Sequence, residues 1–394
     1  MTTVVSSVVG HLGEEFLAQV YGRTYRHFPG SPDRFGGLLD WSDLNGLLTH
    51  HRLEPPRLRL SMNGEALPQH AYTVPVTTRR STVWHRLKPA DLHQHLAEGA
   101  TLVLDAIDEL HPGIGEVAQG LECHLRTGVQ VNAYASWTPA EGFGIHWDDH
   151  DVLILQLDGA KRWRIYGPTR QAPLHRDTEV PEPPPNEPLA DLVVSAGDML
   201  YLPRGWWHAV AASEGVHSLH LTCGMQTTTG ADLLQWLSED MRREVIVRSD
   251  LPRFGTDEEK ADFARSLGDL VIKEFEDGTL IDRFLTVRDA TESARLAPSL
   301  PYVEGVPPDP ALSVRLVTAR AWLGGDPEGH AVLRAGGEEW TFSPQTAPLL
   351  ALLMKGGRHR LDTLARAAGL RVGQVALLVS ELVEGEVAAV ERAE

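Results

Sequence analysis

Two separated segments of this chain carry side chains that ligate transition metals. The first contains His146-Trp-Asp148, and the second ends in Pro203-Arg-Gly-Trp-Trp-His208. In an extended strand residues two apart point to the same side, so His146 and Asp148 can reach one ion while Trp147 faces the other way. Two histidines and one carboxylate leave coordination positions open, which is typical of non-haem Fe(II) sites that activate dioxygen.

Other ligands and another metal remain open at this stage. His150 and Asp149 compete with the first pair, and His217 and His220 follow the second segment. Because His150 and Asp149 are adjacent, we expect them to be exposed or to support the ligands. Because His217 and His220 do not stand behind the Pro-x-Gly turn, we expect them to belong to the core or to support the ligands. Zinc is the rival ion, since catalytic zinc sites also combine three protein ligands with an open position. The chain has no His-Glu-x-x-His pattern, which disfavours a helical zinc site.

The strands around these segments predict a polar interior. Alternation in 129–136 places Gln130, Asn132, Tyr134 and Ser136 on one face. Residues 151–157 read as a buried strand, Asp158-Gly159 predicts a hairpin turn, and 161–166 read as the return strand. Lys161 then faces inward near the metal. A fixed cation there suits a bidentate cosubstrate with a remote carboxylate, such as 2-oxoglutarate.

Together with Gln156-Leu-Asp-Gly159, Lys161-Arg-Trp-Arg164 and Gly197-Asp-Met-Leu-Tyr-Leu-Pro-Arg-Gly-Trp-Trp-His208, these motifs resemble the JmjC-type ribosomal oxygenases, also described as the cupin-4 group. Members of that family are Fe(II)- and 2-oxoglutarate-dependent protein hydroxylases that modify side chains of ribosomal proteins. The resemblance implies an α+β fold: a double-stranded β-helix (cupin/jelly-roll, JmjC-like) core with flanking helices, a helical dimerisation segment and a C-terminal winged-helix-like domain. The specific motifs cover only about 129–226.

The resemblance also implies roles for individual residues. It places the catalytic metal on His146, Asp148 and His208, and the distal carboxylate of 2-oxoglutarate on Lys161 and Tyr134, with Asn132 nearby. Fe(II), 2-oxoglutarate and O2 are the implied cofactors and cosubstrates. An inward lysine is similar to the histidine-modifying branch, whereas the bacterial arginine-modifying branch carries its anchoring base elsewhere. Histidyl and arginyl hydroxylation therefore both stay open.

A length of 394 residues predicts two or three domains. The pattern along the chain and the resemblance divide it into a catalytic domain over 1–226, a helical dimerisation segment over 227–300 and a winged-helix-like domain over 301–394. Helices are predicted over 41–51, 89–98, 111–125, 231–248, 256–276, 361–368 and 372–384, and a Pro-rich exposed loop over 181–188. Residues 372–384 contain no Lys or Arg. A recognition helix without a cation reads DNA poorly, so we expect no direct DNA binding.

Composition restricts the partners and the compartment. A net charge of −18 disfavours naked nucleic acid and suits a basic protein, such as a ribosomal protein, although many proteins are acidic for solubility alone. Two cysteines fit a reducing cytosol, and no signal peptide or membrane span is visible. We expect a cytoplasmic protein, and the resemblance implies a homodimer.

Two other classes of function remain. The same oxygenase chemistry can act on a peptide natural product, a tRNA base or a methyl-lysine, where hydroxylation leads to demethylation. A metal-binding cupin without catalysis is the third reading. The residues name neither the substrate protein nor the carbon that is modified.

Overall fold

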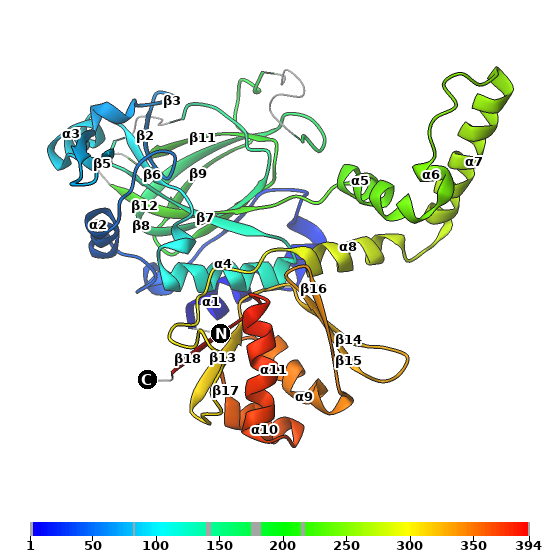
Figure 1. The fold of residues 1–394 in the computed structure, drawn as a ribbon. Helices are drawn as coiled ribbons and strands as arrows, with labels where there is room; N and C mark the ends of the chain where they lie inside the picture. The colour runs from blue at the N-terminus through cyan, green and yellow to red at the C-terminus, as the bar shows by residue number, and fades with distance from the viewer. Residues whose placement is uncertain (1–2, 82, 139–142, 175–182, 214–216, 393–394) are drawn as a thin grey trace. The chain divides into compact units, whose positions relative to one another are not determined.

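The computed structural model describes residues 3–81, 83–138, 143–174, 183–213 and 217–392 (Figure 1). They form two compact units, Met1–Thr227 and Thr228–Glu394. The three-domain division expected above stays a prediction. None of the described helices is long and apolar enough to cross a bilayer.

The first unit is built on a ten-stranded antiparallel sheet that curls into a jelly-roll barrel (Figure 1). The strand path is β1-β10-β8-β12-β7-β6-β2-β3, and β9 and β11 also pair with β8. The bounds are β1 Arg26–Phe28, β2 Leu58–Met62, β3 Glu65–Ala66, β6 Thr101–Leu104, β7 Val129–Ser136, β8 Asp151–Pro168, β9 Ala190–Ser195, β10 Met199–Leu202, β11 Trp206–Ala212 and β12 Ser218–Met225. A separate ribbon pairs β4 (Thr73–Thr77) with β5 (Val83–Leu87).

Strand β8 passes from one half of the barrel to the other. Its first part pairs with β10 and β12, and its second part pairs with β9 and β11. The predicted hairpin at Asp158-Gly159 is therefore wrong, because the chain continues through it as one strand. Gly159 has φ +64°, and close to it the register with β12 shifts between Leu219, the partner of Asp158, and His220, the partner of Gln156. The positive φ that was expected for a turn serves instead to bend the strand.

Helices cover the outer face of the sheet. Pro112 starts α4 (Pro112–Leu125), whose apolar residues Ile114, Val117 and Leu121 recur on one face and pack in the same core as Val131 of β7. Helices α1 (Thr3–Leu12), α2 (Trp41–His50) and α3 (Pro89–Ala97) contribute to the same core. A second cluster joins both parts of β8 with β9 and β10 and fills part of the barrel interior: Val152, Ile154, Trp163, Ile165, Val194, Leu200 and Leu202. The polar face of β7 lines the part of the barrel interior that this cluster does not fill.

The second unit combines helices and two small sheets. Its helices are α5 (Gly230–Asp240), α6 (Val245–Arg248), α7 (Asp257–Glu276), α8 (Leu280–Thr291), α9 (Ala347–Met354), α10 (Leu361–Ala368) and α11 (Val372–Glu384). The sheets are β17-β13-β18 (His359–Arg360, Leu312–Leu316, Ala388–Arg392) and β14-β15-β16 (Trp322–Gly325, Ala331–Ala335, Glu338–Phe342). The first sheet and α9–α11 form the expected winged-helix-like arrangement.

Most helix predictions agree with these bounds to within a residue. A capping box between Thr256 and Glu259 starts α7 where the sequence places the helix. The continuous helix predicted over 231–248 is wrong, because α5 ends at Asp240 and α6 begins only at Val245. Of the predicted loop over 181–188, residues 181 and 182 lie outside the described residues, and 183–188 contain no helix or strand.

Candidate metal centre

Backbone hydrogen bonds join the two segments that carry the candidate ligands. His146 N donates to His208 O at 3.0 Å, and His208 N donates to His146 O at 2.8 Å. Gly205 N donates to Asp148 O at 2.7 Å. Gly205 has φ +74°, and an added Cβ would lie 2.4 Å from Pro173, so this position of the turn requires glycine. The spacing of the three side chains is therefore set by the backbone.

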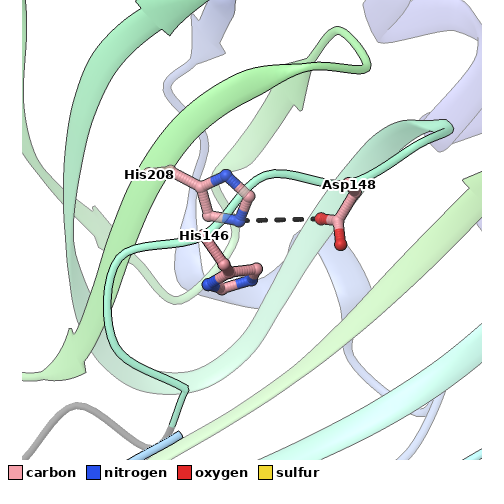
Figure 2. Close-up of side chains that lie close together, drawn as sticks. All are labelled: His146, Asp148 and His208. Carbon is pink, nitrogen blue, oxygen red and sulfur yellow. Dashed lines mark ion pairs between the residues drawn. The ribbon is translucent and has the colours of Figure 1, made fainter. Parts of the chain in front are cut away.

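Figure 2 shows the side chains of His146, Asp148 and His208 close together. One ligand atom from each residue lies within 4.8 Å of the others, and Asp148 Oδ2 is 3.6 Å from His208 Nε2. The centroids of the two imidazole rings are 4.3 Å apart. The structure thus brings together the three residues predicted from the sequence. Their role as metal ligands remains a prediction, although the donor set suits a divalent transition metal.

Hydrogen bonds select the tautomer of both imidazoles. His146 Nδ1 lies 3.0 Å from the carbonyl oxygen of Gly144, and His208 Nδ1 lies 2.9 Å from that of Trp206. A carbonyl oxygen only accepts, so each Nδ1 carries the proton. Each Nε2 then presents a lone pair, which is the form of histidine that binds metals.

Large aromatic side chains next to the three candidate ligands pack against the segments that carry them. Trp147 points away from the ligands, as the alternation predicts, and is buried with Trp207, Tyr166 and Ala209. The indole of Trp163 stacks on the His208 ring with centroids 5.7 Å apart. Both ligand segments are thereby fixed by large apolar contacts.

A cavity of about 340 Å³ adjoins the three residues. Its wall comes from β2, β6, β7, β8, β11, β12 and the loop before β8. The lining residues are Arg59, Gly64, Thr101, Asn132, Tyr134, Phe143, His146, Asp148, His150, Val152, Lys161, Trp163, His208, Val210, His220, Thr222 and Gly224. The polar face of β7 contributes Asn132 and Tyr134, as expected for a polar interior.

Lys161 is a buried base in the wall of this cavity. It is 4% exposed, and burial lowers the pKa of its ammonium to about 7. The described part of the chain offers it no hydrogen-bond or ion-pair partner. A buried cation without an anion is unfavourable, so the position is suited to an anionic ligand. Burial and the charge of Asp148 raise the pKa of Tyr134, which keeps its phenol protonated and able to donate.

Asn132 lines the cavity but is already engaged with the protein. Its Oδ1 accepts hydrogen bonds from Ala106 N at 2.9 Å and from Gln130 Nε2 at 3.0 Å. Ala106 has φ +50°, so Asn132 holds a left-handed backbone bend after β6. Its predicted place beside 2-oxoglutarate stays a prediction.

The competing histidines take different positions. His150 Nδ1 lies 3.0 Å from Asp149 Oδ1, and His217 Nε2 lies 2.9 Å from Asp158 Oδ2. Neither histidine belongs to the group of converging ligand atoms. His220, in contrast, is buried in the cavity wall.

Arg59 is a cavity residue that sequence reasoning missed. Its guanidinium is held by both oxygens of Asp105, at 2.9 and 3.1 Å. Leu58 and Leu60 on either side are fully buried, so the alternation in β2 is the signal that turns Arg59 to the opposite face.

Comparison with known proteins agrees with this geometry. Residues 114–233 match the JmjC domain model. The chain is 32% identical over 209 residues to the bifunctional lysine-specific demethylase and histidyl-hydroxylase NO66 of Dictyostelium discoideum, covering 50% of this chain and 41% of that protein. It is 37% identical over 145 residues to ribosomal oxygenase 2 of Rattus norvegicus, covering 35% and 31%. The chain thus spans less than half the length of these relatives.

The whole fold has a counterpart among solved structures. YcfD, a ribosomal oxygenase from Escherichia coli solved in complex with cobalt and 2-oxoglutarate, superposes with a TM-score of 0.60. The match covers 96% of this chain and 97% of that one at 17% identity, a level that speaks for the fold alone. Residues 114–233 of this chain are therefore similar to a JmjC domain, and the chain shares its fold with YcfD.

Proposed function

We propose that this protein is an Fe(II)- and 2-oxoglutarate-dependent dioxygenase that hydroxylates a side chain of a ribosomal protein. The observation that carries the proposal is the convergence of two histidines and one carboxylate beside a cavity whose wall holds a buried lysine that has no partner among the described residues. Relatives named histidyl-hydroxylase and ribosomal oxygenase support the reaction and the substrate class.

The residues present fit the metal that this chemistry requires. Nε2 of His146, Nε2 of His208 and the carboxylate of Asp148 would hold Fe(II) on one side and leave the cavity side for cosubstrate and dioxygen. Bound Fe(II) would supply the activation of dioxygen, coupled to oxidative decarboxylation of 2-oxoglutarate to succinate. The protein would contribute fixed ligands and an oriented cosubstrate.

The cavity wall supplies the partners for 2-oxoglutarate. The Lys161 ammonium would pair with the carboxylate remote from the metal, and the protonated phenol of Tyr134 would donate to it. This pairing would compensate a charge that the protein otherwise buries alone. A fixed remote carboxylate would in turn orient the keto acid end toward the metal ligands.

The charges of the cavity favour histidyl over arginyl hydroxylation. Among its described lining residues Asp148 is the single carboxylate, while Arg59 and Lys161 are bases. A substrate guanidinium would need a carboxylate partner, and the described lining offers only Asp148, which the proposal assigns to the metal. A neutral imidazole has no such requirement.

A homodimer formed through the helices of the second unit is part of the proposal. Apolar side chains along α7, α8 and the loop before them are exposed: Phe254 at 97%, Ile272 at 57%, Phe275 at 50%, Ile281 at 61% and Leu285 at 41%. Such a stripe marks an interface, and a second copy buries it in the self-complementary way that dimers favour. The net charge of −18 suits a basic substrate. A cytoplasmic location, where the two free cysteines stay reduced, completes the proposal.

The decisive experiment is the intact mass of every ribosomal protein from cells with and without the gene. Loss of one oxygen atom's mass from a single ribosomal protein supports the proposal and names the substrate. An unchanged ribosome refutes the ribosomal substrate. Metal analysis and 2-oxoglutarate turnover with the purified chain then separate an oxygenase acting on another target from a cupin without catalysis.

A further inference from the structure

The cavity holds a second buried polar group for which the metal centre has no use, the imidazole of His220. We propose that His220 is a positioning residue that donates a ring N–H to the remote carboxylate of the cosubstrate, beside Lys161. This inference rests on the proposed function, because it concerns the same cosubstrate.

The ring of His220 is held in place from two sides. It lies on β12 directly opposite Tyr134 of β7, and the two rings stack with centroids 5.0 Å apart and an interplanar angle of 6°. The indole of Trp163 packs edge-on against it at 6.2 Å. A side chain that is 3% exposed and confined between two aromatic rings keeps one orientation, as a specific donor requires.

This fixed imidazole has no hydrogen-bond partner among the residues that the structure describes. Its Nδ1 is fully buried and unpaired, and no bond to Nε2 is found in the described ranges. Buried polar groups are nearly always hydrogen-bonded, so an unpaired ring in a cavity wall points to a ligand. Lys161, in the same wall, also lacks a partner there. One carboxylate, with two oxygens, satisfies both groups.

The protonation states suit a single negative charge. Burial lowers the pKa of His220 well below its usual range, and the nearby charge of Lys161 lowers it further. The imidazole is therefore neutral and carries one N–H. Lys161 supplies the compensating charge and His220 supplies an uncharged donor, so the subsite with its carboxylate is electrically balanced.

The test compares two keto acids on the full-length chain loaded with Mn(II), a metal that does not turn the cosubstrate over. 2-Oxoglutarate has the remote carboxylate, and pyruvate shares the keto acid end but lacks it. His220→Phe retains a ring for stacking on Tyr134 and removes the N–H. We expect calorimetry to give a Kd for 2-oxoglutarate that is about 10-fold to 150-fold weaker, the range for a hydrogen bond to a charged group. Pyruvate affinity and Mn(II) content should not change.

A conservative pair and a matched control complete the design. His220→Gln restores a donor and should recover much of the 2-oxoglutarate affinity, whereas the similarly shaped His220→Met should not. This pair carries the test if the Phe variant does not fold. His217→Phe alters an exposed histidine outside the cavity and should bind both keto acids as the unmodified chain does.

The outcomes separate the two levels of the proposal. Equal weakening of pyruvate and 2-oxoglutarate in His220→Phe, or unchanged 2-oxoglutarate affinity, overturns the role of His220 and leaves the proposed function standing. If the unmodified Mn(II)-loaded chain does not bind 2-oxoglutarate at all, the proposed function fails, and the inference fails with it.

Discussion

Replacing Lys161 by Met should have opposite effects on stability and on cosubstrate binding. The substitution keeps an unbranched stem in a site that is 4% exposed and removes the ammonium. Burial lowers the pKa of Lys161 from 10.5 to about 7, and each pKa unit corresponds to about 1.4 kcal/mol. The buried charge therefore costs the ligand-free protein at most about 5 kcal/mol, and Lys161→Met should raise its free energy of unfolding by part of that amount.

The same variant should lose affinity for 2-oxoglutarate. A hydrogen bond to a charged group contributes about 1.5–3 kcal/mol, so the Kd should rise by about 10-fold to 150-fold. Metal content should stay as in the unmodified chain, because Lys161 is not among the converging ligand atoms. Urea denaturation of the metal-free chain and calorimetry of the Mn(II)-loaded chain measure the two effects.

The pH dependence follows from the direction of the pKa shift. Between pH 7 and 10.5 the unfolded chain holds a proton that the folded chain releases, so stability should rise with pH in this window. Affinity for 2-oxoglutarate should fall in the same window, because the neutral amine no longer pairs with a carboxylate. In Lys161→Met, the contribution of this ammonium to the pH dependence of stability and of 2-oxoglutarate affinity should disappear. A variant that is less stable without ligand, or that binds 2-oxoglutarate as tightly as the unmodified chain, would refute the reasoning.

Three further substitutions test other parts of the structure. Asp148→Ala should remove bound iron and abolish succinate production, and continued iron-dependent turnover would exclude Asp148 as a ligand. Ile281→Asp on exposed α8 should shift the chain toward monomer in sedimentation without loss of the thermal transition; an unchanged dimer would place the interface elsewhere. Gly159→Ala should lower the free energy of unfolding by about 1 kcal/mol or more, because φ is +64° at the bend of β8, and unaltered stability would show that the bend tolerates a Cβ.

Local patterns were sufficient for the elements and for the identity of the candidate ligands. Period-two alternation placed His146 with Asp148 and turned Trp147 into the apolar cluster. The same alternation separated the polar face of β7 from its buried face, and helical periodicity placed the start of α7 to within a residue. These features depend on residues within a few positions of one another, which is the range over which backbone geometry dictates side-chain direction.

Long-range pairing decided the rest. Asp158-Gly159 permits positive φ, and only the neighbouring strands determine whether that becomes a hairpin or a bend in β8. Alternation assigns His220 and Arg59 to a face of their strands, but the curvature of the barrel decides that this face lines the cavity. The approach of His208 to His146 requires two backbone hydrogen bonds between distant segments. A sequence encodes which residues can share a face, whereas closure of the sheet sets which faces meet, because that depends on all the strand pairings at once.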